Sequence, residues 1–260
     1  MTIPRGDYAS VSLLITHYNR SKSLARLLDS IKQTGINFAK IVVSDDCSKP
    51  EHLNYLNALK EQYGFSLLTA PINRGLANNL NKGQLHIKTP YTLYVQEDFV
   101  PLRGFKQAFD DALDLMEEDL SIDIARFYAY GNYPYMKPYK RDYLSMHYKP
   151  WYTDTNKIYQ YSDHPHLRRS TFLNKFGLYV EGIKSDKTEY RMCISFIKKK
   201  GRGIFYRDYK ALFSQENSSD EPSTVKREAW RQSNNFFISI IRKLYRQIKY
   251  NYDIHISNKI

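Results

Sequence analysis

The sequence predicts one α/β domain with a Rossmann-like, mostly parallel sheet that carries helices on both faces. Over the first hundred residues, apolar runs of strand length alternate with segments in which apolar residues recur at helical spacing. The 260 residues suffice for one large core and are too few for two full-sized domains with a linker. Polar residues follow the apolar runs directly, at the edge where open parallel sheets bind ligands.

The first hundred residues are expected to hold four strands and three helices. The strands are expected at residues 11–15, 41–43, 65–68 and 91–95. The helices are expected at residues 24–35, 50–64 and 75–87. Ser48, Pro50 and Glu51 have the pattern of a capping box at the start of the second helix.

The rest of the chain is less regular. Helices are expected at residues 105–116 and 188–200, and strands at 122–128 and 204–206. Residues 132–163 are rich in aromatic side chains without a clear period, and residues 214–223 have the composition of a polar loop.

The last segment predicts a basic amphipathic helix. Its apolar residues recur at helical spacing, and basic residues fill the other positions: Phe237, Ile240, Ile241, Leu244 and Ile248 against Arg242, Lys243, Arg246 and Lys249. Such a helix either lies in an anionic membrane surface or packs its apolar face on the main domain. Both interpretations fit the pattern.

Charge and composition limit the location and the partners. The net charge of +12 lies almost entirely in residues 187–210 and 223–260, each with eight Lys/Arg against two acidic residues, so these surfaces suit phosphate groups. The isolated cysteines Cys47 and Cys193 fit a reducing compartment. No apolar N-terminal run or bilayer-spanning run occurs in the sequence, so we expect a cytoplasmic protein.

Polar side chains at the strand ends should meet at one rim of the sheet. They are Thr16, His17, Tyr18 and Asn19; Asp45 and Asp46; Asn73, Arg74 and Gly75; and Gln96, Glu97 and Asp98. Glu97 and Asp98 suit a divalent cation that binds diphosphate oxygens, because they follow an apolar strand. Asp45 and Asp46 either cap the following helix or accept a hydrogen bond from a nucleotide base.

Four segments of the chain resemble motifs of family 2 glycosyltransferases, which have the GT-A fold. VSLLITHYNR, IVVSDDCS, NRGLANNLNKG and YTLYVQEDF occur in the order and spacing of the family strings VSVIIPTYNR, IIVVDDGS, NxGxxxARNxG and YIxFLDADD. Further on, LRRSTFLNKFGLY and TEYRMCISFIKKKGRGIFY resemble the family's FRRSxFxxxGxF and EDxxLxxRLxxxGxxIxY segments. The similarity extends with gaps from Val11 to about Ser219.

The resemblance implies a catalytic domain over residues 1–222 and a helical extension over 223–260. Residues 8–100 would bind the nucleotide, and residues 101–222, including the aromatic stretch, would bind the acceptor. The implied reaction is inverting transfer from a nucleotide-sugar donor to a saccharide or lipid-linked saccharide acceptor, in surface polysaccharide or glycan synthesis. A lipid-linked acceptor favours the membrane interpretation of the last helix, with the protein peripheral on the inner face of the cytoplasmic membrane.

The resemblance also implies roles for individual residues. His17 and Asn19 would lie near the nucleotide, Asp45 or Asp46 would hold the base, and Arg74 would lie close to it. Gln96 and Glu97 belong to the same donor site, and Asp98 would bind Mn²⁺ or Mg²⁺. Glu189 matches the general base, with Asp186 and Glu181 as the next candidates.

Several positions depart from the family pattern. Gln96 replaces the first Asp of the metal motif, Phe99 replaces a frequent Asp, Leu80 replaces an Arg, and Thr188 replaces the first acid of the ED pair. Gln215 stands near the place of a metal-binding His. The metal site is therefore expected to be weak or to recruit Glu97. His164 and His166 are interpreted as acceptor-facing or surface residues rather than as metal ligands.

Three other classes of protein share some of these sequence features. A nucleotidyltransferase would need a glycine-rich loop after the first strand, and THYNRSKS has no glycine. A nucleic-acid binder fits the pI near 9.4 but leaves the acidic residues at the strand ends unexplained, so no nucleic acid is expected. A catalytically degenerate transferase fold is the third alternative, because Gln96 and Thr188 replace acids.

Overall fold

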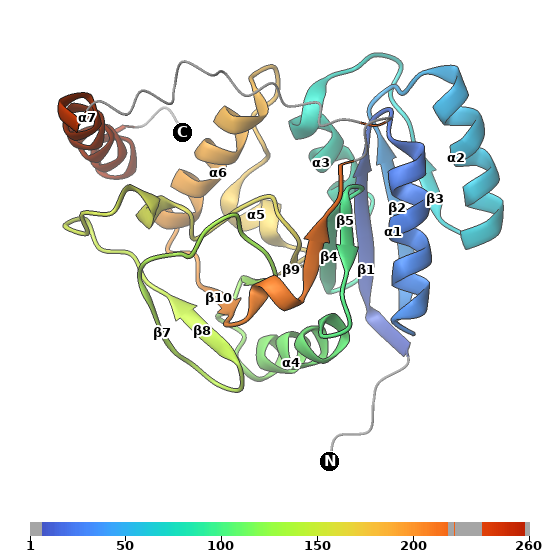
Figure 1. The fold of residues 1–260 in the computed structure, drawn as a ribbon, viewed down its shortest axis with the longest axis horizontal. Coiled ribbons are helices and arrows are strands. Elements are labelled where there is room, and N and C mark those ends of the chain that lie inside the picture. Colours follow the sequence, from blue (N-terminus) through green and yellow to red (C-terminus); the bar gives the residue numbers. More distant parts are fainter. Residues whose placement is uncertain (1–6, 218–220, 222–235, 258–260) are drawn as a thin grey trace.

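The computed structural model describes residues 7–217, Glu221 and residues 236–257. Within these ranges a nine-stranded sheet runs in the order β3-β2-β1-β4-β9-β6-β10-β8-β7, and β11 and β5 form a separate pair (Figure 1). The strands are β1 (Asp7–His17), β2 (Asn37–Asp45), β3 (Ser66–Leu68), β4 (Tyr91–Gln96), β5 (Phe99–Pro101), β6 (Ile124–Arg126), β7 (Met136–Pro138), β8 (Tyr143–Met146), β9 (His166–Arg169), β10 (Gly203–Tyr206) and β11 (Phe213–Gln215).

The sheet is mostly parallel, as predicted. β1 pairs in parallel with β2 and β4, β2 with β3, and β6 with β10. β9 runs antiparallel between β4 and β6, and β8 runs antiparallel between β10 and β7. β6 therefore points in the same direction as β1 and β4, and its carboxyl end lies at the same rim.

Helices cover both faces of the sheet. They are α1 (Ser21–Gln33), α2 (Pro50–Tyr63), α3 (Gly75–Leu85), α4 (Phe105–Glu118), α5 (Phe172–Phe176), α6 (Ser185–Lys198) and α7 (Phe236–His255), with 3-10 turns at Thr155–Ile158 and Tyr209–Ala211. One core joins β1 residues Leu13 and Ile15 to α1, α2 and α4. A second core joins Leu14 to α3, α5 and α6. Alternate residues of β1 are buried on opposite faces, which explains its continuous apolar run.

The structure corrects the sequence prediction in three segments. The aromatic stretch contains the hairpin β7–β8, which pairs with β10 at the end of the sheet. The segment predicted as a polar loop begins with β11, which pairs with β5. These three strands, of three or four residues each, are too short for a two-residue period to stand out, and long-range pairing decides their conformation. α6 begins at Ser185, three residues before the predicted start.

The predicted capping box at α2 is wrong. The N-cap residue is Lys49, and it makes no side-chain cap. Ser48 instead donates its hydroxyl to Asp45, and the hydroxyl accepts from the backbone N–H of Asn19. A buried carboxylate that needs donors competes for the serine, so Ser48 joins the loops after β1 and β2.

The C-terminal helix α7 packs on α6 (Figure 1). Ile254 is buried against Ile158, Ile194 and Ile197, while the predicted apolar face, represented by Ile241 at 68% exposed, points to solvent. The domain therefore covers a different face of α7 from the one that the apolar pattern indicated. The predicted boundary between residues 222 and 223 lies outside the described residues. No helix in the described ranges has the length and apolar character needed to cross a bilayer.

Candidate active site

Several strands bring their ends to one rim of the sheet. His17, Asp45, Gln96 and Arg126 are the last residues of β1, β2, β4 and β6. Because β9 runs in the opposite direction, its first residue, His166, lies at this rim as well, paired with Tyr94 and Arg126. The loop that precedes β9 is therefore part of the site.

His17, Asn19 and Asp45 form a buried network beneath the rim. Asp45 accepts from His17 Nδ1 at 2.8 Å and from the Ser48 backbone N–H at 2.9 Å, and His17 Nε2 accepts from the Arg20 N–H. Burial raises the pKa of Asp45, but the hydrogen bonds from His17 and Ser48 lower it overall. Asn19 has a positive φ of 53° and accepts from the Lys49 N–H. The carboxylate of Asp45 is fully buried, so these residues hold the loops of the rim in place through hydrogen bonds.

Asp46 holds the start of α3. Its two carboxylate oxygens accept from the backbone N–H groups of Arg74, at 2.9 Å, and Gly75, at 2.7 Å. This arrangement favours a carboxylate at the positive end of the helix. The predicted capping role thus belongs to α3 and not to α2, the helix that follows Asp46 directly.

Arg74 lines a cavity beside this helix end. The cavity has a volume of about 390 Å³ and is lined by Thr69, Ala70, Pro71, Ile72, Arg74, Asn78 and Lys82. The Arg74 guanidinium pairs with Glu181 at 2.7 Å, and Asn78 and Asn81 also donate to that carboxylate. Asp46 lies behind this wall, because its carboxylate bonds to the backbone N–H of Arg74.

The carboxylate of Asp98 forms an ion pair with an arginine. Its Oδ2 atom lies 3.1 Å from Arg20 Nη1 and accepts a hydrogen bond of 2.9 Å from Gln215 Nε2. Arg20 is 5% exposed, and its Nη2 donates to Asn217. β11 positions Gln215, because its pairing with β5 places that residue opposite Phe99.

Glu97 lies near the same guanidinium nitrogen as Asp98, 3.6 Å from Arg20 Nη1. Burial and the charge of Asp98 raise the pKa of Glu97 to about 8, although Arg20 opposes the shift. Gln96 is half-buried at the end of β4.

The described side chains do not form a complete metal site around Asp98. No group of three His, Cys, Asp or Glu side chains able to hold a metal occurs among the described residues. The Asp98 carboxylate is already bonded to Arg20, Glu97 lies beside the same guanidinium, and the positive charge of Arg20 opposes a second cation. Binding there would require Arg20 to move or a ligand to supply further oxygens.

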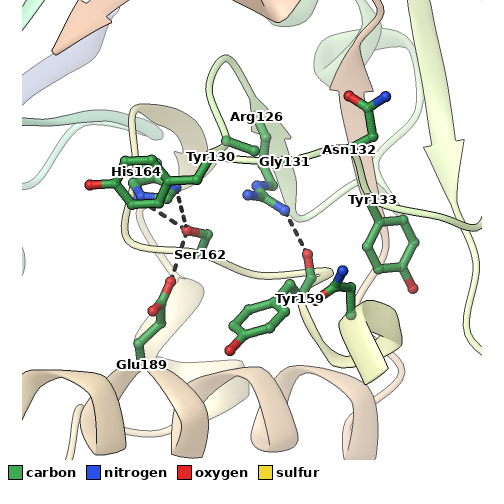
Figure 2. Close-up of a pocket in the computed structure, with 11 residues that line it drawn as sticks. Arg126, Tyr130, Gly131, Asn132, Tyr133, Tyr159, Ser162, His164 and Glu189 are labelled. Atoms are coloured by element: carbon green, nitrogen blue, oxygen red, sulfur yellow. Dashed lines mark hydrogen bonds between the residues drawn. The ribbon is translucent and has the colours of Figure 1, made fainter. Parts of the chain in front are cut away.

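Glu189 lies on the wall of a second cavity, of about 240 Å³ (Figure 2). Ser162 donates its hydroxyl to Glu189 Oε1 at 2.8 Å, and His164 Nδ1 lies 2.8 Å from the Ser162 oxygen. Burial lowers the pKa of His164 to about 3, so the imidazole is neutral and Nδ1 donates to Ser162. His166 is fully buried and does not line the cavity.

Asp163 is a carboxyl partner of Glu189 that the sequence did not reveal. Its backbone N–H lies 3.4 Å from Glu189 Oε1, and the two carboxyl groups share a hydrogen bond. Burial and the charge of Glu189 raise the pKa of Asp163 well above its ordinary value.

Arg20, Asp163 and Arg126 are the site residues that sequence reasoning missed. Arg20 stands in the first motif, directly after Asn19, so its position carried a signal. Asp163 and Arg126 carried none, because the direction of β9 and β6 decides their place at the rim. Asp186, considered as a base, is exposed in the first turn of α6, and Glu181 pairs with Arg74.

Solved glycosyltransferase structures share this fold. The 1–349 fragment of S. aureus TarS in complex with UDP-GlcNAc superposes with a TM-score of 0.61 at 17% identity, over 95% of this chain and 74% of that fragment. The mannosyltransferase PcManGT from Pyrobaculum calidifontis, in complex with GDP-Man and Mn²⁺, gives 0.56 at 14% over 96% and 70%. GalNAc-T7 with UDP, GalNAc and Mn²⁺ gives 0.59 at 13% over 94% and 50%.

The sequence itself matches the profile of Glycosyl transferase family 2 over residues 12–179. No curated protein sequence matches the chain. The matched region includes β1 to β4 and β9, with the rim residues His17, Asp45 and Asp98. Since this match spans more than half of the chain and the fold is that of GT-A glycosyltransferases, the protein belongs to Glycosyl transferase family 2.

Proposed function

We propose that the protein transfers a sugar from a nucleotide-sugar donor to an acceptor hydroxyl with inversion at the anomeric carbon. One observation carries the proposal: a hydrogen-bonded path joins the Glu189 cavity to Asp98. Tyr130 lines the cavity and donates to Gln215 at 2.9 Å, and Gln215 donates to Asp98. The acceptor and donor positions are therefore neighbours.

The chemistry divides between the two ends of this path. Glu189 accepts the proton of the acceptor hydroxyl as its oxygen attacks the anomeric carbon. The bond from that carbon to the diphosphate breaks on the opposite side, and the nucleoside diphosphate leaves with the negative charge. The Arg20 guanidinium, beside Asp98, supplies positive charge where the leaving group forms.

Metal dependence, with Mn²⁺ or Mg²⁺ at Asp98, remains a prediction from the family resemblance. Such a cation would neutralise diphosphate charge. PcManGT and GalNAc-T7 were each crystallised with Mn²⁺. In this chain the Arg20 guanidinium already forms an ion pair with the Asp98 carboxylate, so Arg20 and a metal ion would compete for that carboxylate.

The donor is proposed to enter over α3. The cavity beside Arg74 suits the nucleoside, and Lys82 lies in its wall. Hydrogen bonds to the neighbouring loops allow four residues to support this cavity: His17, Asn19, Asp45 and Asp46. Gln96 and Glu97 directly precede Asp98 in the chain, at the end of β4.

Donor turnover tests the proposed function. UDP-, GDP- and dTDP-sugars are incubated with saccharide and lipid-linked saccharide acceptors, and release of the nucleoside diphosphate is measured with and without Mn²⁺. At least one donor should be turned over, with product of inverted configuration by NMR. Retained configuration would contradict the role of Glu189, and absence of turnover with every donor would favour a degenerate module.

We also propose peripheral attachment to an anionic membrane surface through α7. Its exposed face carries Ile241, Leu244, Tyr245, Ile248 and Tyr252, each more than half exposed, and the basic Lys243 and Arg246 are exposed beside it. Each basic residue near an anionic leaflet contributes about 1 kcal/mol, which gives reversible, salt-sensitive binding.

Sedimentation with vesicles checks this attachment. The wild type should sediment with anionic vesicles and be released by salt, while replacement of Ile241, Leu244 and Ile248 by Gln should leave the protein in the supernatant. A control variant with Gln at the exposed Leu85, Leu120 and Leu178 removes equivalent apolar surface elsewhere. Equal sedimentation of both variants would contradict membrane attachment through α7.

A further inference from the structure

A buried arginine points into the Glu189 cavity. Arg126 ends β6, is 3% exposed, and directs its guanidinium into the space between Ser162, Tyr159 and Tyr133 (Figure 2). Nη1 donates to the Tyr159 carbonyl at 2.6 Å and Nη2 to the Tyr128 carbonyl at 3.4 Å. Nε has no hydrogen-bond partner among the residues that the structure describes.

No counter-ion contacts the charge of Arg126 in the part of the chain that the structure describes. Among the described residues, Arg126 forms no ion pair, and the hydrogen bonds that it makes go to two neutral carbonyl groups. The neighbouring Arg168 is equally buried, but Nε, Nη1 and Nη2 all donate, to Gln84 and Tyr179. The partners of Arg168 are neutral as well, so Arg126 differs from it by the unsatisfied Nε and by its position in the wall of a cavity.

An unpaired buried guanidinium is costly, and an anion would relieve that cost. Burial of a charge without a partner is strongly unfavourable, so a protein retains such a charge where it has a role such as ligand binding. A guanidinium binds carboxylate and phosphate groups through paired, charge-assisted hydrogen bonds. Nη2 of Arg126, which is only weakly bonded at 3.4 Å, and the buried Nε, which has no partner among the described residues, are the two donors that such a pair would use.

The rest of the cavity suits a sugar ring. Tyr130, Tyr133 and Tyr159 offer aromatic faces, and Asn132 and Asn156 offer amide groups. The volume of about 240 Å³ lies just below the range of about 300 to 1,000 Å³ for drug-sized ligands. One sugar residue, rather than a long chain, would fill it.

We propose that the acceptor is an acidic saccharide, whose carboxylate or phosphate group binds Arg126 while one of its hydroxyl groups faces Glu189. Figure 2 shows the two side chains on different sides of the cavity. Arg126 thereby selects the acceptor and orients it. This inference rests on the proposed function, since it assigns the substrate class of the same site.

Direct binding tests the inference without any donor. Matched pairs are titrated into the protein by calorimetry or NMR: methyl hexuronosides against methyl hexosides for the carboxylate, and hexose 6-phosphates against hexoses for the phosphate. At least one acidic class should bind about 10- to 100-fold more tightly than its neutral partner, as expected for a charge-assisted pair. Equal binding of the acidic and neutral sugars in both arms would overturn the inference.

Variants assign the preference to Arg126. Arg126→Gln should reduce binding of the acidic sugar to the level of the neutral one and leave neutral binding unchanged, and Arg126→Lys should keep part of the preference. Arg202→Gln, which removes a positive charge from an exposed side chain outside the cavity, is the control and should behave as wild type. Equal weakening of both sugars by Arg126→Gln would show that Arg126 only supports the cavity, and would overturn the inference.

The outcome is separable from that of the proposed function. If Arg126→Gln does not fold, the wild-type comparison and Arg126→Lys still decide. Binding of acidic sugars without transfer from any donor would keep the inference and overturn the function. Transfer to neutral acceptors with no gain from an acidic group would keep the function and overturn the inference.

Discussion

Glu189→Gln is expected to leave donor binding intact and to lower turnover by roughly 10²- to 10⁴-fold, because the amide cannot accept the acceptor's proton. The substitution keeps the shape of the side chain and can still accept the hydrogen bond from Ser162. Turnover is measured at saturating donor and acceptor, and donor affinity by calorimetry. A loss confined to turnover identifies a group that acts in the chemical step.

Two further variants make this result specific. Asp186→Asn removes an exposed carboxylate from the first turn of the same helix and should behave as wild type. Asp163→Asn removes the carboxyl group beside Glu189 that raises with it the cost of negative charge in the site, so it should lower turnover less and move the pH profile. If Glu189→Gln keeps wild-type turnover and Asp163→Asn loses it, the base is Asp163 and the assignment of Glu189 is wrong.

Asp98→Asn is expected to lower transfer by about 10²- to 10³-fold, the size seen when a group that organises charge at a leaving group is lost. The amide would no longer hold Arg20 by charge, and it is a poor ligand for a divalent cation. Both donor affinity and turnover should fall, which distinguishes Asp98 from Glu189. Asp123→Asn, which disrupts the pairing with Lys175 outside both cavities, is the matched control.

Chelation and an arginine variant separate the two sources of positive charge near Asp98. If a metal acts there, excess chelator should suppress the wild type and added Mn²⁺ should restore it. If Arg20 acts instead, the wild type should remain active in chelator and Arg20→Gln should lose activity. Unchanged transfer by Asp98→Asn would exclude both roles.

The central sheet was predictable because its strands are buried on both faces. In β1, Leu13 and Leu14 contact different cores, so the apolar run is continuous and stands out against the helical period of Leu24 and Leu27. The polar residues at the strand ends were predictable for the same reason, since parallel strands bring their carboxyl ends to one rim. The family motifs lie on these elements.

The role of each rim residue was not predictable from its position. His17 and Asp45 were expected to face a nucleotide, and they bond to each other in the interior. A polar residue at a strand end looks the same in sequence whether it binds a ligand or supports a loop. Its depth below the rim, which depends on the packing of neighbouring loops, makes the difference.

The amino-acid pattern alone was enough to predict the α/β fold, the family and the rim at which we propose the site. The three-dimensional contacts were needed to place Asp163 beside Glu189, Gln215 beside Asp98, and Arg126 in the wall of the cavity. Local periodicity records which side of an element is buried, and it holds no information about the strand direction of β9 or the partner of β11. Those features arise from contacts between residues far apart in the chain, and they decide which charges meet.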